Sequence, residues 1–395
     1  MPGSRSGTHM IESLTDRQRL VMDFLAGAQP QMLDLLQRIV DIDSGSYHKA
    51  GVDAVVAELR AWLVRHGVAC ELHRNEGAGN CLRAMVPGAE GPPVLLMGHC
   101  DTVFPEGTAA QRPFRIDGDL AYGPGVADMK AGLVANSFVL AAFAHAGLRV
   151  PMLGLYTADE EIASPASRSF IEAHAAQARA VFNSEPGRPS GNVVTGRKGA
   201  MFVDCEVRGV AAHSGGNFHE GASAIEAMCR KVVQMHRLTD DESGTTVNVG
   251  LVNGGSSVNT VAALATASVD VRFKTTEAMD AVKAKLAAIV AEVEVPGTCA
   301  HIRQQRYFLP LVPTAASKAL FESYVGAAGA IGFATGGEFS GGSADSGFTA
   351  AAGVPTLCGT GPVGGKVHTA DEWLKVSTMV PRAQAIALTA LRLLS

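Results

Sequence analysis

The sequence predicts an α/β protein with a mixed, largely parallel sheet, interrupted by an inserted α+β domain. Short apolar runs alternate with helical periods, an order typical of parallel strands joined by helices. The predicted strands are 93–97, 152–157 and 181–183, and the predicted helices are 53–66, 129–147 and 166–178. From residue 197 onward the strands become longer and alternate in polarity, which favours a separate antiparallel sheet.

The predicted insertion combines an antiparallel sheet with two helices. Its strands are 200–207, 245–252 and 263–273, and its helices are 221–236 and 276–293. In the last strand Val269, Val271 and Phe273 share one face, and Asp270 and Arg272 share the other. We expect both helices to cover the apolar face, as in a compact α+β domain.

Length and composition are those of a folded chain with two domains. The 395 residues are 47% hydrophobic and 18% charged, which allows a substantial core in each domain. The α/β pattern resumes with helices at 315–328 and 376–394. We therefore predict one domain formed by 11–196 and 309–395, and an inserted domain at 197–308. The first ten residues lack the apolar core of a signal peptide and are not assigned to either domain.

Charge and cysteine content limit the expected partners and compartment. The net charge of −5, with no basic stripe, argues against a nucleic-acid partner. No apolar run reaches the roughly 18 residues of a membrane span, so we expect no membrane association. The seven cysteines are odd in number and form no C-x-x-C pair, which favours reduced thiols and a cytoplasmic location.

Metal-competent side chains follow each of the three predicted parallel strands. His99 follows the first strand, Glu160 and Glu161 the second, and Glu185 the third. The carboxyl ends of parallel strands meet at one edge of a sheet, where ligands commonly bind. Imidazoles and carboxylates form a ligand set that Zn²⁺ accepts. The predicted ligands are His99, Asp128, Glu161, Glu185 and His368, enough for two ions if one carboxylate bridges them.

Each of these motifs also has a simpler structural interpretation. Asp128 precedes a predicted helix and could serve only as its N-cap. Glu160 and Glu161 could form a solvated acidic turn, or divide the roles of general base and ligand. Asp101 could cap a turn, or accept the second ring N–H of the nearby histidine. His213 could be a surface residue, or could stabilise an oxyanion.

Six motifs in order nevertheless point to one group of enzymes. The segments GHCDTV, GPGVADMKAG, DEE, SEPG, AAHSG and VHTADEW span nearly the whole chain after the first ten residues. Together they resemble the aminoacylase/carboxypeptidase family of di-zinc hydrolases, and within it the bacterial glutamate carboxypeptidases. The resemblance implies a catalytic domain that holds two zinc ions and an inserted dimerisation, or lid, domain.

The resemblance also implies a role for each predicted ligand. His99 and Glu185 would hold one Zn²⁺, Glu161 and His368 would hold the other, and Asp128 would bridge them. Glu160 would be the general base and Asp101 the partner of His99. Mn²⁺ or Co²⁺ remain alternatives to zinc, because affinity order and cellular supply both decide which metal is bound.

Residues of the inserted domain would recognise the substrate. His213 matches a histidine that reaches the active site of the neighbouring subunit in a homodimer. Asn259 and Arg272 match the residues that bind the substrate carboxylate, and Arg306 is a less firmly aligned second guanidinium. In the loop 341–345, Ala344 replaces a hydroxyl side chain, and a lysine used for glutamate selection is missing after the SEPG motif.

The expected activity is hydrolysis of an amide that joins an acyl or peptidyl group to an amino acid with a free α-carboxylate. The altered loop leaves glutamate preference open. An aminoacylase, a dipeptidase or an aromatic deaminase on the same scaffold is the alternative. A zinc-bound binding protein without catalysis is a third interpretation, which the presence of Glu160 disfavours.

Overall fold

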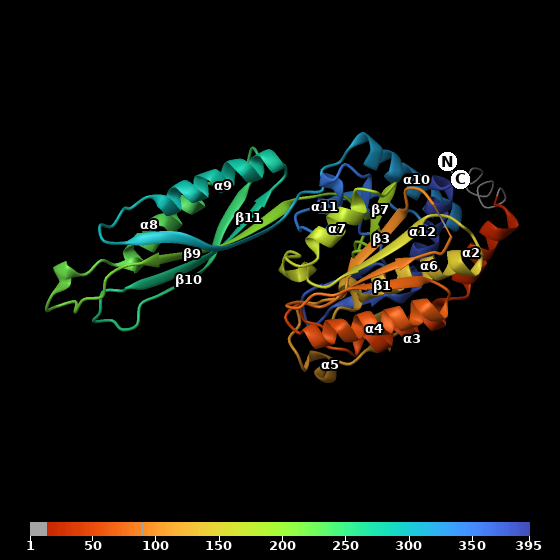
Figure 1. Cartoon of the computed structure of the whole chain (residues 1–395), viewed down its shortest axis with the longest axis horizontal. Helices are drawn as coiled ribbons and strands as arrows, with labels where there is room; N and C mark the ends of the chain where they lie inside the picture. The colour runs from red at the N-terminus through yellow and green to blue at the C-terminus, as the bar shows by residue number, and fades with distance from the viewer. Residues whose placement is uncertain (1–13, 89) are drawn as a thin grey trace. The chain divides into compact units, whose positions relative to one another are not determined.

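The computed structural model describes residues 14–88 and 90–395, which form two compact units (Figure 1). Unit 1 contains the described residues up to Gly196 together with Pro313–Phe339 and Phe348–Ser395. Unit 2 contains Arg197–Val312 and Ser340–Gly347. It therefore runs slightly beyond the predicted insertion at 197–308. The predicted domain start at residue 11 lies outside the described residues.

The main sheet has the predicted mixed character. Its strand order is β1-β2-β6-β3-β7-β14-β8-β13. The central strands β6 (Met152–Thr157), β3 (Val94–His99), β7 (Ala180–Asn183) and β14 (Thr356–Cys358) run parallel. The flanking strands are β1 (Ala69–His73), β2 (Cys81–Met85), β8 (Val193–Arg197) and β13 (Gly337–Ser340). β3, β6 and β7 are buried along their whole length, which explains their continuous apolar sequence.

Helix α6 (Ala131–His145) is the core helix of unit 1. It packs on β3 and β6 and against helices α2, α3, α4 and α12. Among the described residues, the helical stretch Val126–His145 has the length and apolar content of a membrane span, but 94% of its most apolar window is buried. Outside 197–312, the described residues also form the helices α2 (Asp16–Ala26), α3 (Gln29–Val40), α4 (Lys49–Arg65), α5 (Thr108–Gln111), α7 (Arg168–Ala175), α10 (Ala315–Ile331), α11 (Ser346–Ala351) and α12 (Met379–Leu393).

A second, smaller sheet brings two distant segments of unit 1 together. Its strand order is β15-β16-β5-β4. The strands are β4 (Arg115–Asp117), β5 (Leu120–Tyr122), β15 (Gly364–Gly365) and β16 (Trp373–Lys375). β5 leads into the segment that carries Asp128, and the chain between β15 and β16 carries His368. Pairing of β16 with β5 therefore aligns these two segments.

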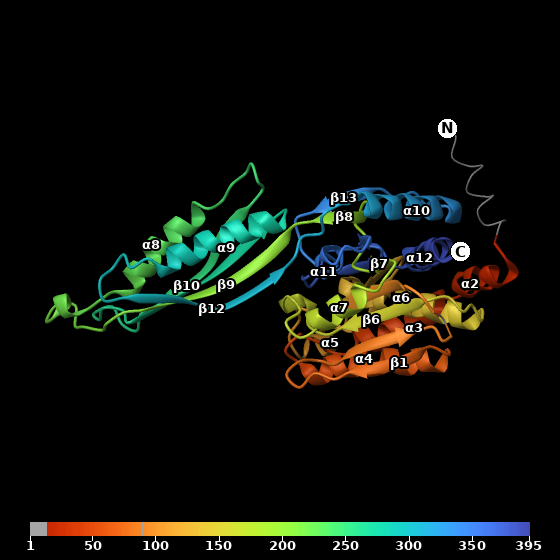
Figure 2. The same cartoon turned by 45° about the horizontal axis from the view of Figure 1, so that its top comes forward.

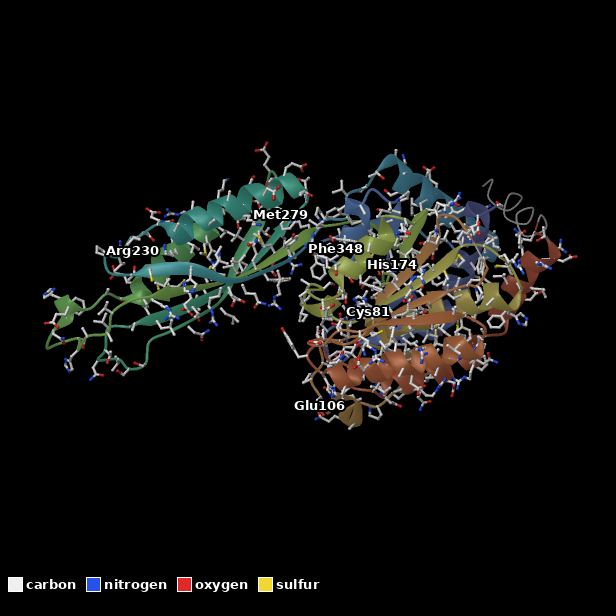
Figure 3. All side chains as sticks on the ribbon, viewed as in Figure 1. Cys81, Glu106, His174, Arg230, Met279 and Phe348 are labelled. Carbon is white, nitrogen blue, oxygen red and sulfur yellow. The ribbon has the colours of Figure 1, made fainter. Side chains whose placement is uncertain are left out.

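Unit 2 is a four-stranded antiparallel sheet with two helices on one face (Figure 2). The strands β10 (Thr246–Gly254), β11 (Leu264–Phe273), β9 (Gly199–Arg208) and β12 (Cys299–Phe308) lie in that order. Helices α8 (Ala224–His236) and α9 (Thr276–Ala291) pack on the apolar face. Met279 of α9 belongs to this core, whereas Arg230 of α8 is exposed (Figure 3). Strand β12 was not predicted.

Candidate metal centre

Three adjacent parallel strands deliver the first ligand candidates to one edge of the main sheet. His99 is the last residue of β3. Glu160 opens the short 3₁₀ turn η2 (Glu160–Ile162), which follows β6. Glu185 comes two residues after β7 ends at Asn183. The strand order β6-β3-β7 places these ends side by side, as expected for polar groups at the carboxyl edge of a parallel sheet.

Asp128 lies between the two histidines. Its Oδ1 is 3.2 Å from His99 Nε2, and its Oδ2 is 3.2 Å from His368 Nε2. His368 Nε2 is also 3.2 Å from Glu161 Oε2. One carboxylate thus presents a separate oxygen to each imidazole, which is the arrangement that a bridging ligand requires. The fold therefore brings Asp128 and His368 into contact although they are far apart in the sequence.

The remaining acidic residues surround His99. Its Nε2 is 3.7 Å from Glu185 Oε1 and 3.8 Å from Glu160 Oε2. His99 belongs to two groups of residues that could hold a metal ion, and within each group the ligand atoms lie within 4.8 Å of one another. The first group also contains Glu160 and Glu185, and the second also contains Asp128 and Glu161. His368 adjoins the second group through its contacts with both carboxylates.

The environment of these residues fits a cation. Glu161 Oε1 is buried and has no hydrogen-bond partner among the described residues. A buried carboxylate oxygen without a partner is costly, and a bound metal ion removes that cost. The donor set of imidazoles and carboxylates is suited to Zn²⁺, and also to Mn²⁺ or Co²⁺.

The charges of the site are strongly coupled. Burial lowers the pKa of His99, but the charge of Glu160 and the hydrogen bonds of the ring outweigh it and hold that pKa well above its usual value. Hydrogen bonds to Asp128 and Glu161 raise the pKa of His368 to about 10, and burial raises the pKa of Glu161 to about 7. Against the effect of burial, the two imidazoles lower the pKa of Asp128. Protons and cations therefore compete for the same atoms.

The simpler interpretations of Asp128 and of the acidic turn are wrong. Asp128 does not cap α6, because the helix begins at Ala131 and its N-cap is Lys130. The predicted helix start at 129 is also wrong, since Asp128 and Met129 have non-helical backbone angles in the turn η1 (Val126–Lys130). Glu160 is only 7% exposed, so the acidic turn is not solvated.

Asp101 is fully buried and connects three parts of the site. Its carboxylate accepts hydrogen bonds from the backbone N–H of Glu160 at 3.0 Å and of Glu161 at 3.1 Å. It also accepts a hydrogen bond from the hydroxyl of Ser46 at 2.6 Å. Its Oδ1 is 3.3 Å from His99 Nδ1, and its carbonyl oxygen is 2.9 Å from that nitrogen. The surface-turn interpretation of Asp101 is therefore wrong.

Sequence reasoning missed two residues of this centre. Ser46 orients Asp101 and stands in a segment with no recognisable motif. Glu372 is 1% exposed and accepts three backbone hydrogen bonds from the segment that carries Asp128. Burial raises its pKa to about 7, although these hydrogen bonds oppose the shift. Its signal was its place in the VHTADEW motif, four residues after His368.

The predicted recognition residues all lie in unit 2. His213 is exposed, and its Nδ1 accepts hydrogen bonds from the backbone N–H of Gly215 at 3.1 Å and Gly216 at 3.0 Å. Its Nε2 therefore carries the ring proton and can donate it. Asn259 is exposed on a neighbouring loop, and its carbonyl oxygen accepts the N–H of Ser214. The fold thus brings His213 and Asn259 together.

Arg272 lies at the other end of strand β11 and is held by its neighbours. Its Nε and one terminal nitrogen each donate to Asp270 at 2.7 Å. Its other terminal nitrogen donates to Ser343 at 3.3 Å. The guanidinium keeps two further N–H groups, one on each terminal nitrogen. Arg306 lies on the same face of the sheet as Asp270 and Arg272. Phe202 of β9 is paired with Asp270 of β11 on one side and with Arg306 of β12 on the other, and directly paired residues point to the same face.

Within one chain, Arg272 is remote from His213 and Asn259. The loops that carry His213 and Asn259 lie beyond Arg208 and before Leu264, at one end of the paired strands β9 and β11. Arg272 is the penultimate residue of β11 at the opposite end. A ten-residue strand spans about 30 Å at roughly 3.4 Å per residue.

Known proteins are similar to this chain over most of its length. Carboxypeptidase G2 of a Pseudomonas species is 27% identical over 376 residues, which cover 93% of this chain and 90% of that protein. Acetylornithine deacetylase of Proteus mirabilis is 29% identical over 62% of this chain and 67% of its own. A metallo-carboxypeptidase of Sulfolobus solfataricus has the same fold, with a TM-score of 0.73 at 18% identity, over 91% of this chain and 98% of its own.

The family profile gives the same result. Residues 95–392 match peptidase family M20/M25/M40, a stretch that includes every predicted ligand and every predicted recognition residue. The resemblance inferred from the six motifs is thereby confirmed. The chain belongs to peptidase family M20/M25/M40 and is a metal-dependent hydrolase.

Proposed function

We propose that this hydrolase cleaves the amide bond of an N-acyl or peptidyl amino acid with a free α-carboxylate, using two Zn²⁺ per subunit. The observation that carries the proposal is Asp128, whose two oxygens each face a different imidazole at 3.2 Å. His99 and Glu185 would hold one cation, Glu161 and His368 the other, and Asp128 both. Measurement of the metal content of the purified protein would distinguish Zn²⁺ from the alternatives Mn²⁺ and Co²⁺.

Glu160 is the proposed general base. When bound, the cations would supply Lewis acidity that lowers the pKa of water and polarises a carbonyl group. Glu160 takes a proton from the attacking water and delivers it to the leaving amine. Asp101 fixes the backbone at this position, because it accepts the N–H of Glu160 and of Glu161. This role requires a carboxylate near the cations, and Glu160 Oε2 lies 3.8 Å from His99 Nε2.

Residues of unit 2 are proposed to recognise the substrate. The two remaining N–H groups of Arg272 suit a substrate α-carboxylate, since guanidinium and carboxylate groups match in planar geometry. Asn259 and, more loosely, Arg306 would add contacts to the same substrate. His213 would donate its Nε2–H to the oxyanion of the tetrahedral intermediate.

We expect the active form to be a homodimer. His213 and Asn259 lie at one end of the unit 2 sheet and Arg272 at the other, so a single copy of unit 2 cannot direct all three side chains at one small substrate. A second copy would supply His213 and Asn259. Unit 2 also exposes large apolar side chains that an interface would cover, including Phe218, Val233, Leu251, Val252 and Val258.

One experiment tests the proposed function directly. The chelated protein receives Zn²⁺, Mn²⁺ or Co²⁺, and hydrolysis is measured over N-acyl amino acids that differ only in the C-terminal residue. We expect activity only with added metal, and a loss of activity when the free carboxylate is converted to an amide. Equal activity on the amide would contradict recognition of the α-carboxylate.

An aminoacylase, dipeptidase or aromatic deaminase specificity is the second candidate. It is supported by the position of Ala344, which is 1% exposed in the loop that also carries Ser343, the partner of Arg272. It is also supported by the similarity to acetylornithine deacetylase. In the same panel, equal or faster hydrolysis of substrates with a C-terminal residue other than glutamate would favour this candidate over a glutamate carboxypeptidase.

A further inference from the structure

Glu372 is a buried carboxylate that contacts the backbone of the metal centre rather than its ligand atoms. Oε1 accepts hydrogen bonds from the N–H groups of Ala127 and Asp128, both at 2.9 Å. Oε2 accepts the N–H of Gly125 at 3.0 Å. With 1% of its surface exposed, Glu372 is shielded from water, so these charge-assisted hydrogen bonds are strong.

The segment around Asp128 is an irregular turn in which one backbone hydrogen bond, from the N–H of Lys130 to the carbonyl oxygen of Gly125 at 3.0 Å, spans Asp128. Gly125 adopts a left-handed conformation with φ of 71°, and Asp128 has φ of −109° and ψ of 95°. The amide groups of this irregular turn converge on the carboxylate of Glu372 as in an anion-binding nest. Three successive parts of the Asp128 segment, the amides of Gly125, Ala127 and Asp128, are therefore anchored by this one side chain.

Glu372 is also tied to the segment that carries His368. It lies four residues further along the chain and directly before β16. Its own N–H donates to the carbonyl oxygen of Thr369 at 3.4 Å. His368 has φ of 63°, a left-handed conformation that is unfavourable for a residue with a side chain. One carboxylate thus links the two segments whose ligands, Asp128 and His368, meet at 3.2 Å.

We infer that Glu372 is a positioning residue that fixes Asp128 relative to His368 and thereby sets the affinity of the site for its cations. The inference rests on the proposed metal-binding function. Partners that orient a metal ligand typically change metal affinity by about 10–100-fold when they are removed. A residue that only stabilised the fold would change the unfolding temperature and leave cation affinity intact.

Two variants of Glu372 form a graded test. Glu372→Gln keeps an oxygen for Ala127 and Asp128 but turns an NH₂ group toward the N–H of Gly125, so one hydrogen bond is lost. Glu372→Ala removes all three. We expect the dissociation constant for Co²⁺, measured by competition with a chromophoric chelator, to rise in Glu372→Ala by about 10–100-fold. Glu372→Gln should lie between this variant and the wild type, with a changed Co²⁺ absorption spectrum in both.

Asp119 provides the matched control. Its carboxylate accepts the N–H of Ser377 at 2.7 Å and the hydroxyl of Ser377 at 2.6 Å. Like Glu372, it accepts hydrogen bonds across two distant segments, here from the β4–β5 connection to the chain after β16, but neither segment carries a ligand. Asp119→Asn should lower the unfolding temperature of the metal-free protein without changing Co²⁺ affinity or the Co²⁺ spectrum.

The outcomes separate this inference from the proposed function. Wild-type protein that binds no Co²⁺ would overturn both. Wild-type binding with unchanged affinity and spectrum in both Glu372 variants would overturn the positioning role alone. The positioning role would also be overturned if the Glu372 variants and Asp119→Asn lost the same Co²⁺ affinity at the same loss of thermal stability. If Glu372→Ala does not fold, Glu372→Gln decides the question by itself.

Discussion

Unit 1 and unit 2 hold their predicted functional residues in opposite ways. In unit 1, His99 is 1% exposed, and the backbones around Glu160 and Asp128 are fixed by the buried carboxylates Asp101 and Glu372. In unit 2, His213 and Asn259 are exposed on loops and are held by short-range backbone contacts. The groups around His99, Glu160 and Asp128 are preorganised, whereas His213 and Asn259 are accessible.

This difference has an energetic consequence. Ligand candidates that are already hydrogen-bonded, such as the buried His99 and the 49% exposed His368, lose little conformational entropy when a cation binds. Exposed side chains lose rotamer freedom when they bind a substrate or a second subunit. Substitutions in unit 1 should therefore affect cations and turnover, whereas substitutions of recognition residues in unit 2 should leave the cations in place.

Asp128→Asn should have the largest effect. The amide keeps one oxygen and replaces the other with an NH₂ group, so the substituted side chain faces one imidazole with the wrong polarity. Both cations lose a shared ligand, and hydrolysis should fall by more than the about 10²–10⁴-fold expected from losing a general base alone. Metal content after dialysis and kcat/KM measure the effect. Asp117→Asn, an exposed carboxylate in β4, is the control, and full metal content in Asp128→Asn would remove the bridging role.

Glu160→Gln should separate chemistry from metal binding. Loss of the proposed base lowers kcat by about 10²–10⁴-fold, because the neutral amide cannot accept the proton. Metal content should match the wild type, since His99, Glu185 and Asp128 remain to hold the cation. Glu160 also lies within ligand distance of His99 and Glu185. A variant that loses one cation would therefore reassign Glu160 from base to ligand.

The carboxyl edge of the sheet, where the ligand candidates gather, was predictable because its signals are local. β3, β6 and β7 are buried throughout, so their sequences are continuous apolar runs, and the polar residues that follow them stand out. His368 differs, because nothing in its local sequence connects it with Asp128. Only its motif and the resemblance assigned it to the metal centre, and the pairing of β5 with β16 explains how it arrives there.

Other features had no usable local signal. β12 reads CAHIRQQRYF and has mostly exposed or half-exposed side chains, so it shows no apolar alternation. The start of α6 was predicted two residues too early. The backbone of the preceding turn is held by hydrogen bonds to the carboxylate of Glu372, which helix propensity does not report. The role of Ser46 depends on a hydrogen bond between segments distant in sequence, which no window of residues reveals. The motif around His368 contains Glu372, but its three hydrogen bonds to the Asp128 segment are equally distant in sequence.

His213→Ala should have the third-largest effect and tests whether unit 2 acts across subunits. Loss of one oxyanion donor costs about 2.7–4 kcal/mol, or about 10²–10³-fold in kcat, with metal content unchanged. An equal mixture of His213→Ala and Asp128→Asn subunits should regain activity, because each hybrid dimer contains one complete site. Random exchange predicts up to about a quarter of wild-type activity for a symmetric dimer. Failure of exchanged subunits to regain activity would contradict a shared site.

Arg272→Lys should have a smaller effect that appears mainly in KM. Lysine keeps the charge but loses the planar pair of N–H groups and the hydrogen bonds to Asp270. A hydrogen bond to a charged group is worth about 1.5–3 kcal/mol, so kcat/KM should fall by about 10–100-fold. Metal content should be unchanged. Ser343→Ala, which removes only the 3.3 Å contact with Arg272, should reproduce a fraction of this loss, and an unchanged KM in Arg272→Lys would exclude carboxylate binding.

Lys231→Met should have no effect on catalysis and should report on unit 2 alone. Lys231 is 2% exposed, and its ammonium donates to the carbonyl oxygens of Ile289 at 2.7 Å and Glu292 at 2.6 Å, at the end of α9. Methionine fills similar space but leaves both acceptors without a donor, a loss of about 1–3 kcal/mol in the free energy of local unfolding.

Hydrogen–deuterium exchange resolves this loss by segment, which matters because a chain with two units need not unfold in one step. Exchange should accelerate in α8 and α9 and stay unchanged in β3 and α6. Lys283→Met, an exposed lysine on α9, should change the free energy by less than about 0.5 kcal/mol. Faster exchange in β3 or α6 of Lys231→Met would show that the metal centre depends on the stability of unit 2, and the contrast between the two units would then fail.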